Sequence, residues 1–284
     1  MDRNLNHPGI AVKLYLVAGN AEFMKKILKC IYSILPYGMQ TWSSRLHYLR
    51  LVSISTIQQE PELNILSTLL GLGDVAVDVG ANIGIYTKHL SGFVGNKGKV
   101  ICIEPFKDTF TQLLFNIKML RLKNVQAFHV AASSVSGEAK LNIPLTSLGL
   151  PNIYQASLLP QIPKDCQYAV ANVKTITLDS LLNKFPVVNF IKIDVEGHEF
   201  DVLNGATEVL AKHKPTLLVE ISGVSDGLSK EAEASINFLR DQGYRPFYVS
   251  GKGLDNWTRP IGVANIFFIH PAGLHKSILS ALPL

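Results

Sequence analysis

The sequence predicts an α/β protein built on a doubly wound, mostly parallel sheet. Apolar runs typical of buried strands alternate with helical segments from residue 75 to about residue 132, and again from residue 189 to about residue 242. This alternation indicates a parallel sheet with right-handed crossovers. Hydrophobic residues make up 47% of the chain and charged residues 17%, which indicates a substantial core rather than disorder.

The first part of the alternation contains three expected strands and two expected helices. The strands are "VAVDVG" (75–80), "KVICIE" (99–104) and "VQAFHVAA" (125–132). Residues 83–93 and 106–120 are expected to form the helices between them. Together these segments predict a β-α-β-α-β unit, in which the carboxyl ends of the strands share one edge of the sheet.

The second part continues the same sheet and closes it. Its expected elements, in order, are the strand 189–194, a helix over 199–211 with apolar residues at helical spacing, the strand 216–222, a helix over 230–242 ended by Gly243, and a closing strand pair, 245–250 and 265–270. The whole alternation gives about seven sheet strands.

Between these two parts the rhythm breaks. "AKLNIP" (139–144) and "VKTITL" (173–178) are expected as strands on either side of a loop rich in proline and serine, residues 145–172. A long loop without secondary structure in a compact domain is usually functional or mobile. We therefore expect this loop to form a wall of a ligand pocket.

Residues 1–70 are expected to form a helical cap that precedes a domain over residues 71–284. Within the cap, residues 23–35 place apolar side chains on one helical face and lysines off it, and a second helix is expected over 61–70. The first helix either packs on the domain or lies on a membrane surface. No run reaches the roughly 18 apolar residues of a spanning helix, so no transmembrane segment is expected.

Charge and cysteine content restrict the class of partner and the compartment. The formal net charge is +5, but the basic residues form no stripe, so nucleic acid is not an expected partner. The three cysteines, Cys30, Cys102 and Cys166, are far apart and odd in number, which fits neither a disulfide framework nor a metal site. We expect a cytoplasmic protein.

The segment "VDVGANIGIY" joins the first strand to the first helix. Gly80 and Gly84 permit a tight turn and close approach to a ligand, and Asp78 lies at the strand end. Glu104 ends the next strand, where a carboxylate can accept hydrogen bonds from both ribose hydroxyls. Asn82 stands where a pyrophosphate-binding loop needs a second glycine, so S-adenosyl-L-methionine is the expected cofactor.

The segment "FIKIDVEGHEF" breaks an otherwise apolar strand with charged residues. An extended chain would place Lys192, Asp194 and Glu196 on one face, at the edge where ligands bind. His198 opens the following helix and is a further candidate. The alternative is a structural ion pair between Lys192 and Asp194. Asp194 and Glu220 are also candidate ligands of a divalent metal, because both offer hard oxygen atoms.

These segments together resemble one known family. "EPEL", "GDVAVDVGANIGIYT" and "KVICIEPF", followed by "FIKIDVEGHE", "VLNGA" and "LLVEI", are similar to the FkbM-type S-adenosylmethionine-dependent methyltransferases over residues 60–222. The resemblance implies a Rossmann-like class I methyltransferase domain whose last strand is reversed. Many relatives are O-methyltransferases that act on sugar or polyketide hydroxyls.

The family pattern also assigns cofactor contacts. It implies that the glycine loop, including Asp78 and Asn82, lines the methionine end of the cofactor and that Glu104 binds the ribose. Similar proteins carry an aspartate near Ser134 that contacts the adenine amino group. Because serine stands here, Ser133, Ser134 and backbone groups are expected to recognise adenine.

The expected reaction is methyl transfer to a hydroxyl of a sugar, glycan or secondary metabolite. Asp194 is the first choice for the base, Glu196 and His198 are its competitors, and Lys192 orients Asp194 or stabilises negative charge. The loop over 145–172 and the cap are the expected walls of the acceptor pocket. Three alternatives stay open: methylation of RNA or protein, a nucleotide-dependent oxidoreductase, and an inactive cofactor-binding partner protein.

Overall fold

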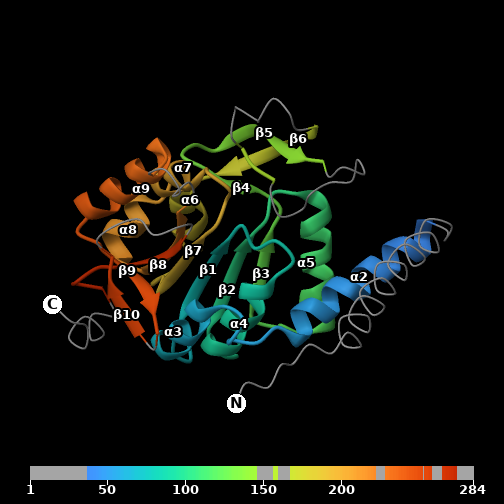
Figure 1. Ribbon diagram of the computed structural model, residues 1–284, viewed down its shortest axis with the longest axis horizontal. Coiled ribbons are helices and arrows are strands. Elements are labelled where there is room, and N and C mark those ends of the chain that lie inside the picture. Colours follow the sequence, from blue (N-terminus) through green and yellow to red (C-terminus); the bar gives the residue numbers. More distant parts are fainter. Residues whose placement is uncertain are drawn as a thin grey trace, which may run out of the picture. The chain divides into compact units, whose positions relative to one another are not determined.

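The computed structural model describes residues 37–145, 156–158, 167–221, 228–251, 253–257 and 264–273 (Figure 1). The chain divides into two compact units, Met1–Tyr48 and Leu49–Leu284. Of the first unit only the beginning of helix α2 (Tyr37–Ile54) is described, and the helix expected over 23–35 lies outside the described residues. Among the described helices, none combines the length and the apolar character that crossing a membrane requires.

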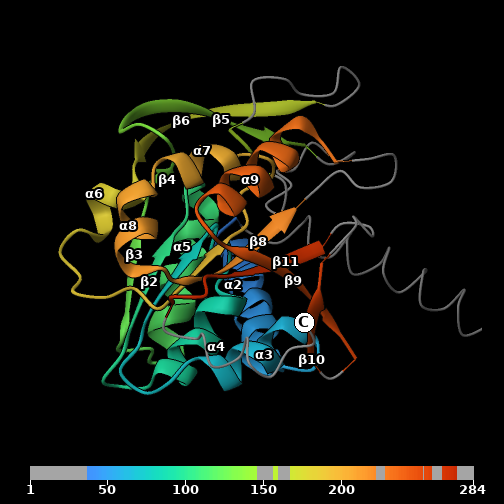
Figure 2. The ribbon, with the colours of Figure 1, turned by 90° about the vertical axis from the view of Figure 1, so that its left-hand side faces the viewer.

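A large sheet forms the centre of the second unit (Figures 1 and 2). Its eight strands lie in the order β10 (Gly253–Asn256), β9 (Arg245–Ser250), β11 (Ala264–Ile269), β8 (Thr216–Ile221), β7 (Phe190–Ile193), β1 (Val75–Val79), β2 (Lys99–Ile103) and β3 (Val125–Phe128).

The strand directions confirm the predicted fold class. The neighbours β3, β2, β1, β7 and β8 are mutually parallel, whereas β11 runs antiparallel to both β8 and β9. The chain builds outward from β1 to β3 and then returns to β7, so the strand order reverses between β1 and β7. Ligands bind at such a switch point. The short strand β10 was not predicted and adds an eighth strand at the edge.

Helices cover both faces of this sheet, which is why its parallel strands are apolar on both sides. On one face, Val77, Ile101 and Ile191 pack in a cluster with helices α6 (Leu178–Leu182), α7 (Glu199–Asn204), α8 (Thr207–His213) and α9 (Lys230–Asp241). On the other face, alternate strand residues pack against α3 (Pro61–Leu69), α4 (Ile85–Val94) and α5 (Lys107–Met119).

Helix α3 packs directly on the large sheet. Leu63 and Leu66 are fully buried in the same cluster as Ala76 of β1 and Phe190 of β7. The division of the chain accordingly falls after Tyr48 rather than at the expected residue 70. Whether residues 1–48 cap the site stays a prediction.

A second, three-stranded sheet contains the two strands expected over 139–144 and 173–178, together with the end of the strand expected over 125–132. β4 (Ala131–Ala132), β6 (Tyr168–Ile176) and β5 (Gly137–Pro144) pair in this order, so the expected strand over 125–132 is two strands in different sheets. His129 lies between them, and its ring stacks on Phe110 with ring centroids 4.9 Å apart. In the loop that joins β5 to β6, residues 146–155 and 159–166 lie outside the described residues.

The single helix expected over 199–211 is wrong, because α7 and α8 are separated at Gly205 and Ala206. Gly205 lies directly against the backbone of Ser133, where a Cβ atom would stand 2.1 Å from the Ser133 carbonyl oxygen. The close approach of two backbones therefore requires glycine here. Sequence periodicity did not detect the break because the apolar spacing continues across it.

We expect Gly205→Ala to lower the free energy of unfolding by about 2 kcal/mol or more, because the added methyl group overlaps backbone atoms that have no room to move. The matched control is Gly92→Ala in α4, where nothing lies within 4 Å of the added Cβ atom. That substitution is expected to raise stability by about 0.5–1 kcal/mol, as alanine favours a helix interior. Urea titration measures both; equal changes would contradict the packing argument.

Candidate functional site

A cavity of about 210 Å³ opens at the carboxyl ends of β1, β2, β7 and β8. Of the residues predicted for the site, those that line it are Gly80, Asn82, Glu104, Asp194, Glu196, His198 and Glu220. Asp78, Gly84, Lys192, Ser133 and Ser134 do not line this cavity. The four strand ends therefore meet as expected, but the predicted residues divide into an inner set and a supporting set.

The glycine loop is held against the end of β7. Gly80 has a φ of 77°, and a Cβ atom there would lie 1.8 Å from the carbonyl oxygen of Asp194. Gly84 has a φ of 94°, and a Cβ atom there would lie 2.7 Å from the end of the Leu113 side chain. Backbone conformation thus favours glycine at both positions, and contact with the Asp194 backbone also requires it at Gly80. Their packing brings the loop next to the acidic residues that follow β7.

Glu104 supports the loop from the neighbouring strand. Its Oε2 atom accepts a hydrogen bond from the Asn82 N–H at 2.9 Å. Its Oε1 atom accepts from the Phe106 N–H at 2.9 Å and from the Thr109 hydroxyl at 2.7 Å. Burial raises the pKa of Glu104, and these donors oppose the shift. The carboxylate is therefore oriented at the cavity wall and retains acceptor capacity on Oε2.

Lys192 is a buried cation in the middle of the sheet, 3% exposed. Its Nζ atom lies 2.6 Å from Asp194 Oδ2 and 4.6 Å from the centre of the Tyr86 ring. Burial alone would lower its pKa, but the carboxylates of Asp194 and Asp78 outweigh burial and raise it. The ion pair that the sequence offered as an alternative is therefore present, and it lies at the edge of the cavity.

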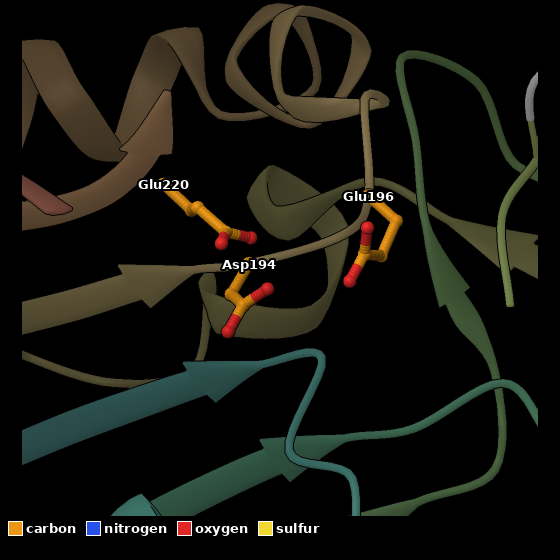
Figure 3. Close-up of side chains that lie close together, drawn as sticks. All are labelled: Asp194, Glu196 and Glu220. Carbon is orange, nitrogen blue, oxygen red and sulfur yellow. The ribbon is translucent and has the colours of Figure 1, made fainter. Parts of the chain in front are cut away.

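The Asp194 carboxyl group of this ion pair also lies close to two other carboxyl groups, those of Glu196 and Glu220 (Figure 3). One oxygen atom from each of Asp194, Glu196 and Glu220 lies within 4.8 Å of the others. Asp194 follows β7, Glu220 lies in β8, and Glu196 lies in the loop after β7. Sequence analysis named all three, and their neighbouring strands explain why they meet.

The three groups differ in their affinity for a proton. Burial raises the pKa of Glu220 to about 8, assisted by its hydrogen bond to Asp194 and by the charge of that residue. Burial, with the charges of Asp194 and Glu199, raises the pKa of Glu196 to about 7. Burial would also raise the pKa of Asp194, but Lys192 outweighs it and lowers the pKa. Near neutral pH the cluster thus contains an ionised, a protonated and a half-ionised carboxyl.

The loop that carries Glu196 is not the extended chain that was expected. Glu196 has a φ of 54° and Gly197 a φ of 94°, so the chain turns directly after Asp194. Glu199 Oε1 accepts hydrogen bonds from the Val195 N–H at 3.3 Å and the Gly197 N–H at 3.0 Å. The Ser157 hydroxyl donates to the Glu196 carbonyl at 2.7 Å. The turn places Glu196 in the cavity although period-two alternation does not apply.

Other protein groups form hydrogen bonds with His198 and with Ser133 and Ser134, the two serines that were expected to recognise adenine. The His198 Nε2 atom is 3.0 Å from the Ser133 hydroxyl, and its Nδ1 atom is 3.3 Å from Asp201. The Ser134 hydroxyl donates to Asp201 at 2.8 Å. Both ring nitrogens of His198 therefore have protein partners, which favours a structural tie between β4 and α7 over a base. Adenine recognition by these serines stays a prediction.

Apolar residues line the part of the cavity beside Glu104. Ile103 and Pro105 come from the end of β2 and Ala131 from β4, while Leu141 of β5 and Leu158 come from the small sheet and its loop. Leu158 belongs to the loop over 145–172, which was expected to form a wall of a ligand pocket. Sequence analysis did not identify Leu141, because an apolar residue in a strand is normally a core residue. Their presence gives the cavity apolar walls as well as acidic ones.

Comparison with known proteins gives one family match. The family model described as the methyltransferase FkbM domain matches residues 78–246, more than half of the chain. A solved FkbM methyltransferase from Methylobacillus flagellatus has 18% sequence identity and a TM-score of 0.47, with coverage of 70% of this chain and 44% of that chain.

Two curated relatives are also similar. The hexuronic acid methyltransferase AglP of Haloferax volcanii is 31% identical over 140 residues, 48% of this chain and 52% of that protein. A tRNA (cytosine(72)-C(5))-methyltransferase of Pyrococcus horikoshii is 29% identical over 102 residues, 34% of this chain and 26% of that protein. The chain thus spans about half of the first relative and about a quarter of the second.

The raised pKa of Glu220 predicts a pH-dependent stability. The folded chain binds this proton more tightly than the unfolded chain does. The free energy of unfolding therefore falls as the pH rises from 4.5, the ordinary pKa of a glutamate, to about 8, the pKa of Glu220 in the folded chain. Glu220→Gln imitates the protonated form and removes this loss. We expect the melting temperature of the variant, relative to the unsubstituted protein, to increase between about pH 4 and pH 9.

Thermal unfolding across this pH range measures the effect. The control is Glu138→Gln, at an exposed position of β5. This control measures the effect of the same substitution at a side chain that is exposed to solvent. A difference for Glu220→Gln that stays constant across the pH range would show that the carboxyl is not held in its protonated form by the fold.

Proposed function

Since this chain belongs to the FkbM-type S-adenosylmethionine-dependent methyltransferase family, we propose that it transfers a methyl group from S-adenosyl-L-methionine to a hydroxyl group of a sugar, a glycan or a secondary metabolite. One observation carries the proposal. The glycine loop at Gly80 touches Asp194, and Asp194 in turn belongs to the carboxyl cluster with Glu196 and Glu220. A donor held by the loop would therefore present its methyl group to groups able to take a proton.

The apolar and acidic residues of the cavity suit the two parts of this cofactor. The apolar walls, with Ile103 and Leu158, would hold the adenine ring. Glu104 would accept hydrogen bonds from the ribose hydroxyls, because within the described part of the chain Oε2 accepts one hydrogen bond, from the Asn82 N–H. The positive sulfonium would then lie near the ionised Asp194, whose charge favours the cationic donor.

Glu196 is the better base, in place of the expected Asp194. Asp194 is bound to Lys192 and its pKa is lowered, so it takes up a proton poorly. The pKa of Glu196 is raised to about 7, and a base with a pKa near the working pH is the most efficient. Ser157 and Glu199 hold the turn that carries Glu196.

The proposed step is an in-line displacement. The acceptor oxygen attacks the methyl carbon, the carbon–sulfur bond breaks, and its electron pair stays on sulfur to give a neutral thioether. Glu196 takes the hydroxyl proton as the new carbon–oxygen bond forms. Holding donor and acceptor in line supplies about 7–11 kcal/mol of the rate acceleration.

A sugar hydroxyl is the acceptor that we favour. A relative of this chain is named a hexuronic acid methyltransferase, and carboxylates are the acceptors that sugar hydroxyls need. The tRNA methyltransferase among the relatives keeps RNA as an alternative, but the sequence shows no basic stripe to bind it. Family membership argues against the oxidoreductase alternative.

Methyl-labelled S-adenosylmethionine tests this proposal directly. We expect the protein, incubated with labelled donor and a cell extract, to transfer label to a compound that mass spectrometry identifies as an O-methyl derivative. Glu196→Gln should reduce the rate about 100-fold or more, because general-base catalysis contributes roughly 10²–10⁴-fold. The acidic limb of the pH–rate profile is expected near the Glu196 pKa of about 7, and it should be absent from the profile of Glu196→Gln.

Calorimetry separates binding from chemistry in this experiment. Glu196→Gln should bind S-adenosylhomocysteine as tightly as the unsubstituted protein, since the base is not a cofactor contact. Label on a nitrogen or on RNA would overturn the acceptor class. Binding without transfer from any extract would favour the inactive partner protein.

The carboxyl cluster also has the donor set for a hard divalent cation. Asp194, Glu196 and Glu220 would hold it, and such a cation would lower the pKa of the acceptor hydroxyl. Two contacts compete with this use: Lys192 already neutralises Asp194, and the hydrogen bond between Asp194 and Glu220 occupies oxygen atoms that a cation needs.

We therefore expect transfer activity to survive treatment with EDTA, because the proton acceptor and the compensating cation are both protein groups. The measurement is the rate of label transfer before and after EDTA treatment and dialysis. Loss of activity that returns with added Mg²⁺ would contradict this expectation and assign the cluster to a metal.

A further inference from the structure

A second cavity of about 200 Å³ lies on the other side of the glycine loop. It shares Gly80, Asn82 and Asp194 with the first cavity, so the two cavities adjoin at these residues. Its other polar lining residues are Glu60, Asp78, Tyr86 and Lys192. The predicted pocket therefore extends past the glycine loop toward Glu60, a residue to which sequence analysis assigned no role in ligand binding.

Asp78 gives this cavity an unsatisfied acceptor. The side chain is 0% exposed, and its Oδ2 atom accepts a hydrogen bond from the Thr87 hydroxyl at 2.6 Å. The Oδ1 atom is buried and has no hydrogen-bond partner. Leaving a buried carboxylate oxygen without a donor is costly, so its position in a cavity wall indicates a ligand that brings the donor.

The charges around the cavity favour a cation. Three carboxyl groups, those of Glu60, Asp78 and Asp194, face a single ammonium, that of Lys192. Lys192 is bound to Asp194 at 2.6 Å, which leaves the other two acids without an equally close cation among the residues that line the cavity. Since buried charges require partners, the cavity is suited to a ligand with an ammonium group.

Glu60 reaches this cavity because of the residue that follows it. Pro61 begins α3 and restricts the preceding residue to an extended conformation, and Glu60 has φ −124° and ψ 101°. Although Glu60 occupies the N-cap position of α3, its side chain makes no capping hydrogen bond. Burial, followed by the charge of Glu62, raises its pKa, and Lys192 and the Tyr86 hydroxyl oppose the shift. The side chain therefore lines the cavity, and a cation in the cavity would stabilise its charge further.

We propose that Glu60 is a further cofactor-binding residue, which together with Asp78 accepts hydrogen bonds from the α-ammonium group of the methionine portion of the cofactor. This rests on the proposed function, since it takes S-adenosylmethionine as the ligand. The sulfonium of a molecule that spans the loop would lie near the shared residue Asp194. The carboxylate of the amino acid would face Ile85, which lines the cavity and opens α4 with N–H groups that have no partner within the helix.

The test compares ligands that differ in the ammonium group. Calorimetry measures the affinity of S-adenosylhomocysteine, of its analogue without the α-amino group, and of 5′-methylthioadenosine, which lacks the amino acid. We expect Glu60→Gln to weaken binding of S-adenosylhomocysteine about 10-fold or more, the effect of a hydrogen bond between charged groups. Binding of the two ligands without the ammonium should change less than about twofold, because they make no such contact.

Glu62→Gln is the matched control, because it removes a charge from the same helix at a residue that does not line the cavity. It should leave all three affinities within about twofold. If Glu60→Gln lowered the affinity for all three ligands equally, Glu60 would have a structural role and the proposal would be wrong. Unchanged affinity for S-adenosylhomocysteine would also overturn the proposal. If Glu62→Gln weakened binding of S-adenosylhomocysteine as much as Glu60→Gln, the effect would come from the general negative charge near the cavity and not from a direct contact of Glu60.

The unsubstituted protein distinguishes this proposal from the function on which it rests. If it binds S-adenosylhomocysteine but Glu60→Gln binds equally well, only the assignment of Glu60 fails. If the unsubstituted protein binds none of the three ligands, the proposed cofactor fails, and the assignment of Glu60 fails with it. Binding of 5′-methylthioadenosine by Glu60→Gln shows that the variant is folded.

Discussion

The buried ion pair between Lys192 and Asp194 is the interaction on which the site depends. A lysine within a central strand has no access to solvent, so it needs the carboxylate 2.6 Å away to stay charged. In return it keeps Asp194 ionised, and the charge of Asp194 contributes to the raised pKa values of Glu196 and Glu220. One pair thus gives three neighbouring acids three different protonation states. Asp194 of the same pair lines both cavities, where the proposed donor site and the proposed base adjoin.

Much of this arrangement followed from the sequence because it depends on strand order. Buried parallel strands are apolar, they alternate with helices, and their carboxyl ends share an edge. Gly80, Glu104, Asp194 and Glu220 each lie in or just beyond such a strand, so placing the strands placed the residues. The family resemblance added the reversed final strand, which periodicity alone does not predict.

Other features depend on contacts between distant segments and had no local signal. Gly205 breaks a helix because of Ser133, which lies far from it in the sequence, while the apolar spacing around it continues unchanged. Leu141 forms a wall of the cavity, yet it is an ordinary residue of an alternating strand. Glu196 reaches the cavity through a turn with positive φ, although the sequence argument relied on an extended chain. The spacing of apolar residues along the sequence indicates local conformation. It does not indicate which distant segments of the backbone lie against each other.

The proposed reaction also explains why a site for a cationic donor contains so many acids. Methyl transfer turns the sulfonium into a neutral thioether and releases a proton from the acceptor. If Glu196 takes that proton, one positive and one negative charge disappear together, and the net charge of the enclosed site is unchanged. Asp194 stays ionised throughout because Lys192 remains beside it. A buried site avoids the large cost of an unpaired charge only when donor and base change charge together. The neutral product then interacts less strongly with Asp194 than the donor did, which favours its release.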